Sequence, residues 1–272
     1  MKKIINYKSK ALSLRKKLFE KFFMLKEGHP GSVFSIIDVL VVLYYGKFIK
    51  IKNNKLVDDL IMSKGHATVA QYPILTDLNI ISKKDWNNWG KNFETCLRMF
   101  GNHKIPGIKV SSGSLGHGVG LASGIAYSSK KKFKKKQVYV IISEGELYEG
   151  STWESLLLLA ELKLDNVFII LDVNNNIILG DPRKCLSLGN IKKKFESFDI
   201  HTEECDGHNF LQIDKKFNKM HKLKKPKCLI VNTIKGKGFK IMENKANWHY
   251  WNSISIEQYN NSLNLLNKYY ER

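Results

Sequence analysis

Between residues 137 and 233, apolar runs of strand length alternate with amphipathic runs of helix length. The runs typical of strands are QVYVII, NVFIILDV, HTEECD and KCLIVNT, and the segments between them with helical spacing are 151–163, about 187–197 and 210–223. Strand–helix–strand repeats close by right-handed crossovers, so this pattern predicts an α/β fold with a parallel sheet and helices on both faces. In such sheets, ligands bind beyond the carboxyl ends of the strands.

The remaining segments have weaker signals. Apolar spacing predicts a helix over 8–26, a second one capped by Ser35 and running to about Phe48, and a third near 68–78. Residues 82–112 are expected to be irregular, and the small residues of LGHGVGLASGIAYSSK suit a tightly packed helix. Because there is no repeat or linker, we expect one domain over 1–272 that ends in a C-terminal tail helix.

Composition excludes several classes of protein. A mean hydropathy of −0.28 and an apolar fraction of 43% are typical of soluble globular proteins. The longest apolar stretch, VFSIIDVLVVLYYG, is too short to span a bilayer and contains Asp38. The basic start MKKIINYKSK has no signal-peptide core, so we expect a cytoplasmic protein with no membrane partner.

The four cysteines form no Cys-x-x-Cys pair, which predicts reduced thiols.

The net charge of +20 raises the question of nucleic-acid binding. Its densest piece is KKKFKKK at 130–136, whereas the other lysines are spread along the chain among Asn and Ile. No zinc-finger, RNP or helix-turn-helix pattern is present. We therefore interpret the charge as a solvated basic surface, with nucleic-acid binding as the alternative.

Polar residues follow two of the predicted strands. Glu144 comes directly after the first and Asn174 directly after the next, so adjacent parallel strands would bring both to one edge of the sheet. Their oxygens suit Mg²⁺ or Ca²⁺ bridging to a phosphate, which Gly145 would let approach the backbone. Alternatively, Glu144, Glu146 and Glu149 cap the helix at 151–163. The residues alone leave both interpretations open.

Most of the eight histidines lie beside a glycine or in a turn rather than in a periodic segment. They include His29, His66, His103, His117, His208 and His249. Several imidazoles in glycine turns indicate a polar pocket that can bind hydroxyls or phosphates and move protons. The alternative is a set of ordinary surface and core histidines. The glycines of SSGSLGHGVG follow no clear strand, so a dinucleotide-binding interpretation fails on context.

Eight pieces in order closely resemble the amino-terminal half of transketolase, and more narrowly the amino-terminal subunit of split, two-gene transketolases. They are EGHPGS, SKGHA, GNHKIPGIKVSSGSLGHG, EGELYEGSTWES, LDVNNN, DGHN, IKGKGF and NWH, over about residues 10–255. The resemblance implies a pyrophosphate-binding domain for thiamine diphosphate, and a transferase that moves a two-carbon ketol unit between sugars or sugar phosphates.

The resemblance also implies roles for particular residues. A divalent metal would be bound by Glu144, Asn174 and the backbone carbonyl of Asn176. The implied cofactor-binding positions are His66, Gly113, Ser114, Leu115, Gly145, Glu146, Asn174 and His249. The implied catalytic residues, which would face the sugar, are His29, His103 and His249.

The resemblance further implies a partner, because the glutamate that activates the cofactor and the arginines that grip a sugar phosphate belong to the carboxyl-terminal half. We expect an α2β2 heterotetramer with a carboxyl-terminal, pyrimidine-binding subunit. Two alternatives are a 1-deoxyxylulose-phosphate synthase-like enzyme and a degenerate, non-catalytic subunit.

The chain departs from the family at the metal position, where Glu144 replaces the usual aspartate and Ser143 the usual glycine. The extra methylene moves the carboxylate by roughly 1.5 Å if the backbone stays in place. This change leaves three alternative outcomes: the loop shifts to compensate, the site prefers Ca²⁺ over Mg²⁺, or cofactor binding is lost.

Overall fold

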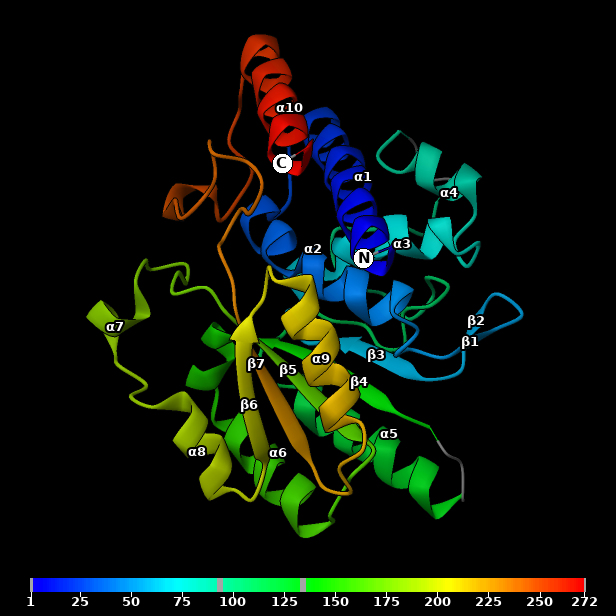
Figure 1. Cartoon of the computed structure of the whole chain (residues 1–272), viewed down its shortest axis with the longest axis vertical. Helices are drawn as coiled ribbons and strands as arrows, with labels where there is room; N and C mark the ends of the chain where they lie inside the picture. Colours follow the sequence, from blue (N-terminus) through cyan, green and yellow to red (C-terminus); the bar gives the residue numbers. More distant parts are fainter. Residues whose placement is uncertain (1, 92–94, 133–135, 272) are drawn as a thin grey trace.

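The computed structural model describes residues 2–91, 95–132 and 136–271. Its centre is a five-stranded sheet in the order β3-β4-β5-β7-β6 (Figure 1). Its strands are β3 (Asp59–Met62), β4 (Val138–Ser143), β5 (Val167–Val173), β6 (His201–Asp206) and β7 (Lys227–Asn232). All four neighbouring pairs are parallel, so the predicted parallel sheet is confirmed. Sequence reasoning did not predict that β7 lies between β5 and β6.

Alternate strand residues face opposite sides of the sheet and build two separate cores. In β4, Val138, Val140 and Ile142 belong to one core, whereas Tyr139 and Ile141 belong to the other. The first core is covered by α5 (Gly118–Lys131), α6 (Gly150–Glu161) and α8 (Ile191–Ser197). The second is covered by α1 (Lys2–Leu25), α2 (Pro30–Tyr45) and α9 (Phe210–Met220). Helices on both faces are therefore confirmed.

The remaining elements are short or peripheral. They are the hairpin strands β1 (Ile51–Lys52) and β2 (Lys55–Leu56), the 3₁₀ helices η1 (Gly65–Gln71), η2 (Glu144–Tyr148) and η3 (Ala246–Trp248), and the helices α3 (Tyr72–Asp77), α4 (Lys83–Asn88), α7 (Pro182–Cys185) and α10 (Ile256–Glu271). The helix α10 is the predicted tail helix, and Figure 1 shows it packed beside α1. The prediction of one domain over 1–272 stays a prediction.

Two predicted helix starts are wrong. The first helix begins at Lys2 rather than near residue 8, because Lys3 and Tyr7 both bind Asp214 of α9 and hold its first turns in place. The second begins at Pro30, a residue well suited to a first helical turn. Ser35 is therefore a buried interior residue rather than a cap.

The elements β3, α7 and η3 were not predicted from the sequence, and neither were three further local elements. The hairpin turn at Asn53 and Asn54 has positive φ angles of 49° and 54°, which asparagine tolerates well. The segment expected to be irregular contains α4, which begins where the Ser82 hydroxyl accepts from the Asp85 N–H. The third is η2, which lies between β4 and α6.

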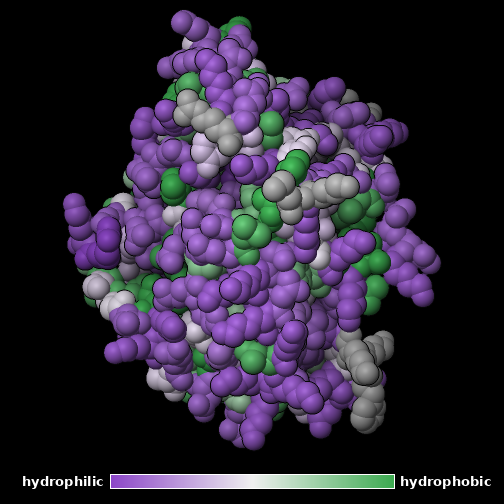
Figure 2. Space-filling view, in the orientation of Figure 1, coloured by the Kyte–Doolittle hydropathy of each residue, from purple (hydrophilic) through white to green (hydrophobic). Residues whose placement is uncertain are grey.

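The surface seen in Figure 2 is mostly hydrophilic, with small scattered hydrophobic patches. Of the basic run 130–136, residues 133–135 lie outside the described part of the chain. Two of its lysines form ion pairs, Lys130 with Asp165 at 3.0 Å and Lys136 with Asp59 at 2.7 Å. Among the described helices, none is both long and apolar enough to cross a bilayer.

Candidate active site

A cavity of about 340 Å³ opens at the carboxyl ends of β3, β4 and β5, where the α/β pattern predicts ligands. Its lining comes from both halves of the sequence. The lining residues are His29, Ser32, Lys64, His66, Phe100, Gly113, Leu115, Ser143, Glu144, Gly145, Tyr148, Asn174, Asn176, Ile177, Ile178, His249 and Tyr250. Four predicted motifs therefore meet in one place. They come from the start of α2 and from the carboxyl ends of β3, β4 and β5.

Glu144 points its carboxylate toward the turn that follows β5. The pairing of Ser143 with Asp172 in adjacent strands aligns the two strand ends. The carboxylate accepts a hydrogen bond from the Asn175 N–H at 3.0 Å, and the residue is 6% exposed. Burial raises the pKa of Glu144, an effect that the Asn175 N–H partly opposes. A nearby cation would remove the cost of this buried charge.

The turn after β5 supplies neutral oxygen atoms next to Glu144. The Asn174 side-chain oxygen accepts from the Asn176 N–H at 3.2 Å, and Asn175 has a left-handed φ of 52° that makes the turn tight. The side-chain oxygen of Asn176 is buried and has no hydrogen-bond partner among the described residues. A buried oxygen without a partner is rare and fits a site that takes a ligand.

Glu146 does not line the cavity, although it is one of the cofactor-binding residues implied by the resemblance. It is fully buried, and its carboxylate accepts from the Ser63 hydroxyl, the Gly116 N–H at 3.1 Å and the Ser143 N–H at 2.8 Å. Glu146 therefore ties the ends of β3 and β4 to the loop before α5, whereas α6 has no side-chain cap at its first turn.

Three imidazoles face one another across the cavity. The ring centroids of His29 and His66 are 5.3 Å apart, those of His29 and His249 are 5.5 Å apart, and those of His66 and His249 are 5.9 Å apart. Burial lowers the pKa of all three rings, with help from Lys235 and Lys64, and that of His249 falls to about 4. At neutral pH the cavity thus contains three uncharged imidazoles.

Lys235 fixes the tautomer of one of these rings. Its ammonium group donates to the Asn176 backbone carbonyl at 3.0 Å and lies 3.1 Å from His249 Nδ1. Because an ammonium group only donates, Nδ1 is the acceptor and the proton of the neutral ring resides on Nε2. His249 therefore presents an N–H donor on its other side.

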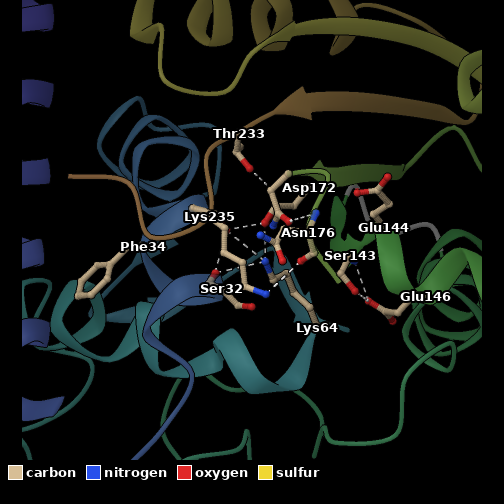
Figure 3. Close-up of polar contacts among 12 residues, drawn as sticks. Ser32, Phe34, Lys64, Ser143, Glu144, Glu146, Asp172, Asn176, Thr233 and Lys235 are labelled. Carbon is tan, nitrogen blue, oxygen red and sulfur yellow. Dashed lines mark hydrogen bonds and ion pairs between the residues drawn. The ribbon is translucent and has the colours of Figure 1, made fainter. Parts of the chain in front are cut away.

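A buried ion pair borders the cavity, and its Lys64 is one of the lining residues. Lys64 binds Asp172 on β5, and both side chains are almost fully buried. Asp172 also accepts from the hydroxyls of Ser35 and Thr233, and Lys64 donates to the Ser32 carbonyl at 3.2 Å. Figure 3 shows Lys64, Asp172, Ser32 and Thr233 near Asn176 and Lys235. The ion pair therefore joins the ends of β3, β5 and β7.

Comparisons with known proteins agree with this arrangement. Residues 10–253 match the family model for transketolase, thiamine diphosphate binding domain. The chain belongs to the transketolase family of transferases. The predicted family, fold class and enzyme class are therefore confirmed.

Two relatives of similar length are each named as one subunit of an apulose-4-phosphate transketolase. The one from Actinobacillus succinogenes is 33% identical over 231 residues, covering 82% of this chain and 82% of that protein. The one from Phocaeicola vulgatus is 33% identical over 254 residues, covering 92% and 89%. A solved transketolase from Campylobacter jejuni has a TM-score of 0.81 at 24% identity. It covers all of this chain, which spans 48% of its length.

Besides Glu146, two residues that the transketolase resemblance assigned to the site, His103 and Ser114, lie outside the cavity lining. His103 is exposed, with its Nδ1 3.0 Å from the Ser111 hydroxyl. Ser114 is exposed in a neighbouring groove that also includes Gly113. The roles predicted for them stay predictions.

Lys64, Lys235 and Asp172 were missed by sequence reasoning. The available signal was a charged residue inside an apolar run, as for Asp172 in FIILDV, which predicts a buried ionic partner without naming it. Lys64 of SKGHA is the ion-pair partner of Asp172, and Lys235 of IKGKGF lies near the same carboxylate.

The donor set fits a divalent cation bound through oxygen atoms. In the described ranges, no three His, Cys, Asp or Glu side chains are placed together to bind a metal. The candidate ligands are instead Glu144 and the oxygens of Asn174 and Asn176, a type of site that Mg²⁺ and Ca²⁺ accept. The missing side chains of Gly113 and Gly145 leave open space beside them, since added Cβ atoms would make no close contact.

Proposed function

We propose that this chain is the thiamine-diphosphate-binding subunit of a two-subunit transketolase. The observation that carries the proposal is the cavity itself. It combines the buried Glu144 carboxylate, the unpartnered Asn176 oxygen and three neutral imidazoles in one space. In this proposal, Glu144, Asn174 and the Asn176 carbonyl bind Mg²⁺, and Ca²⁺ is the alternative ion because Glu144 is one methylene longer than aspartate.

The other predicted positions take roles around this metal. Gly145 leaves room for the diphosphate at the end of β4, and Gly113 and Leu115 line the same cavity. We assign Glu146 an indirect role, because its carboxylate fixes the loops that form the site. His103 and Ser114 would reach the ligand where a second subunit covers this exposed rim.

When bound, thiamine diphosphate supplies a carbon nucleophile and an electron sink for cleaving the ketose. The protein contributes orientation and proton transfer. His249 offers its Nε2–H to an oxygen of the substrate, and His29, whose buried Nδ1 has no partner in the described part of the chain, can accept a proton. Their low pKa values keep both rings neutral, as a group that accepts or donates a hydrogen bond at neutral pH requires.

We further propose a carboxyl-terminal partner subunit in an α2β2 assembly, acting in the cytoplasm on a ketose phosphate. The names of the two relatives make apulose 4-phosphate the first substrate to test. The experiment measures two-carbon transfer to an aldose phosphate acceptor by this chain, with and without a purified companion subunit. We expect turnover only with both chains; turnover by this chain alone would refute the partner requirement.

A non-catalytic subunit is the second candidate, favoured only by the replacement of the usual aspartate with Glu144. A mixed assembly that binds thiamine diphosphate but transfers no two-carbon unit from any ketose phosphate would support it.

A further inference from the structure

A second buried polar cluster lies outside the cavity, between α1, α2 and the loop that follows β6. Asp38 is 3% exposed and accepts from two Arg15 nitrogens, at 2.7 and 3.0 Å. It also binds His208 Nδ1 at 2.8 Å. We call Arg15, Asp38 and His208 the Asp38 cluster. None of the three lines the cavity.

Two members of the Asp38 cluster bind the backbone on either side of Lys235. His208 Nε2 accepts from the Ile234 N–H at 2.8 Å, and Arg15 Nε donates to the Lys237 carbonyl at 3.0 Å. Because Nε2 is an acceptor, the neutral His208 ring carries its proton on Nδ1 and donates it to Asp38. Only this tautomer makes both bonds, so Asp38 selects the state of the ring that binds the loop.

The Lys235 side chain is also confined from a third direction. The Gly236 N–H donates to the Gly31 carbonyl at 2.8 Å, and a Cβ on Gly31 would lie 3.0 Å from Lys235 Cγ. From this position the ammonium group reaches the Asn176 carbonyl and His249 Nδ1. The loop thus places one side chain between a candidate metal ligand and a candidate substrate-binding ring.

We propose that the Asp38 cluster is a clamp that positions Lys235, and through it His249 and the Asn176 carbonyl, for ligand binding. Arg15, Asp38 and His208 are positioning residues, since none of them lines the cavity and they reach it through Lys235. The inference rests on the proposed function of the cavity. A cluster that only joined α1 to α2 would need the Arg15–Asp38 pair alone, whereas His208 and Arg15 Nε bind the backbone around Lys235.

The test compares three variants of the full chain with a fourth, Lys235→Met, which removes the ammonium group and gives the reference direction of the resonance shift. His208→Leu removes both ring bonds, and His208→Gln keeps a donor and an acceptor about as far apart as the two ring nitrogens. His221→Leu is the matched control, because His221 is also a partly buried histidine bonded at both nitrogens, to Phe217 and Tyr139. His221 does not line the cavity.

Two measurements are made on each variant. The first is the ¹⁵N resonance of His249 Nδ1 without ligand, and the second is the calorimetric affinity for thiamine diphosphate with Mg²⁺ after mixing with the companion subunit. We expect His208→Leu to shift the resonance in the direction seen for Lys235→Met and to weaken affinity about tenfold. His208→Gln should restore both properties, and His221→Leu should leave both unchanged.

A His208→Leu chain with the wild-type resonance and affinity would overturn the clamp, and so would the same changes in His221→Leu. If His208→Leu does not fold, His208→Asn replaces it with the same expected result, because its shorter amide can still bind Asp38 but does not reach the Ile234 N–H. If the wild-type chain mixed with its companion subunit binds no thiamine diphosphate, the proposed function fails, while the His249 resonance still tests the clamp.

Discussion

The Asp38 cluster and the cavity are two buried polar regions of the same fold, and they differ in how completely their atoms are paired. Every side-chain nitrogen and oxygen of Arg15, Asp38 and His208 has a partner. In the cavity, His29 Nδ1 and the Asn176 side-chain oxygen are buried without partners among the described residues. Since buried polar groups are nearly always paired, the first region is complete as folded and the second is complete only with a ligand.

The two carboxylates show the same contrast. Burial alone would raise the pKa of Asp38, but Arg15 and His208 outweigh it and lower the pKa to about 2. Glu144 accepts from one backbone N–H, and burial raises its pKa. Loss of Asp38 should therefore damage folding, and loss of Glu144 should damage binding.

Removing Asp38 should have the largest effect. Asp38→Ala leaves Arg15 buried without its counter-charge, which costs about 3–5 kcal/mol of unfolding free energy. Urea unfolding of the ligand-free chain measures the loss. The control is Asp77→Ala, which breaks the exposed pair with Lys10 and should cost about 1 kcal/mol or less. Equal losses in the two variants would contradict the contrast.

Replacing Glu144 should have the next largest effect, on affinity rather than stability. Glu144→Gln removes the charged metal ligand and should weaken thiamine diphosphate binding with Mg²⁺ on the order of 100-fold. Calorimetry measures the affinity, with Glu161→Gln on the exposed face of α6 as the control. The ligand-free variant should be at least as stable as the wild type, because burial disfavours the charge of the Glu144 carboxylate and raises its pKa. A loss of stability without a loss of affinity would make Glu144 a structural residue.

Shortening the same side chain should have a smaller effect. Glu144→Asp restores the family's usual ligand, so the dissociation constants with Mg²⁺ and Ca²⁺ should each change by about tenfold or less. Because Mg²⁺ requires a tighter shell, the ratio of the two constants should move in favour of Mg²⁺. A ratio identical to that of the wild type would show that the extra methylene does not influence the choice of metal.

The smallest expected effect is on the pH dependence of stability, which His249 and Asp38 should influence in two separate pH ranges. His249 has a folded pKa of about 4 against an ordinary value of 6.5, so the unfolded chain binds more protons between these values and stability falls as pH drops through them. Asp38 has a lowered pKa, so its contribution is present above about 3.8 and is lost only as pH falls toward 2. Urea unfolding from pH 7 to 3 of His249→Gln should show a shallower loss between 6.5 and 4. An unchanged slope there would mean that His249 does not titrate as a buried neutral ring.

The sequence predicted the parts of the site that depend on strand ends. Glu144 and Asn174 follow two strands of clear apolar character, and the parallel register brings them together as expected. The contacts of Lys235 could not be predicted in this way, because they require β7 to lie beside β5 rather than at the sheet edge. No local pattern sets that order.

The Asp38 cluster could not be predicted from the sequence either. Asp38 was visible as a lone charge in an apolar helix, but its partners lie 23 and 170 positions away along the chain. His208 was grouped with the other histidines in glycine turns, yet both its nitrogens are used by the protein. Burial and pairing, which distinguish a structural histidine from one that faces a ligand, are set by tertiary packing.

The most direct test of the account is a calorimetric titration of the wild-type chain, mixed with its companion subunit, with thiamine diphosphate. It is run in Mg²⁺, in Ca²⁺ and with a chelator of divalent cations. The account predicts saturable binding, with one ligand per copy of this chain, in at least one of the two ions and its loss with the chelator. Absence of binding in both ions, or equal binding with the chelator, would contradict the claim that Glu144 and its neighbours form a metal-dependent cofactor site.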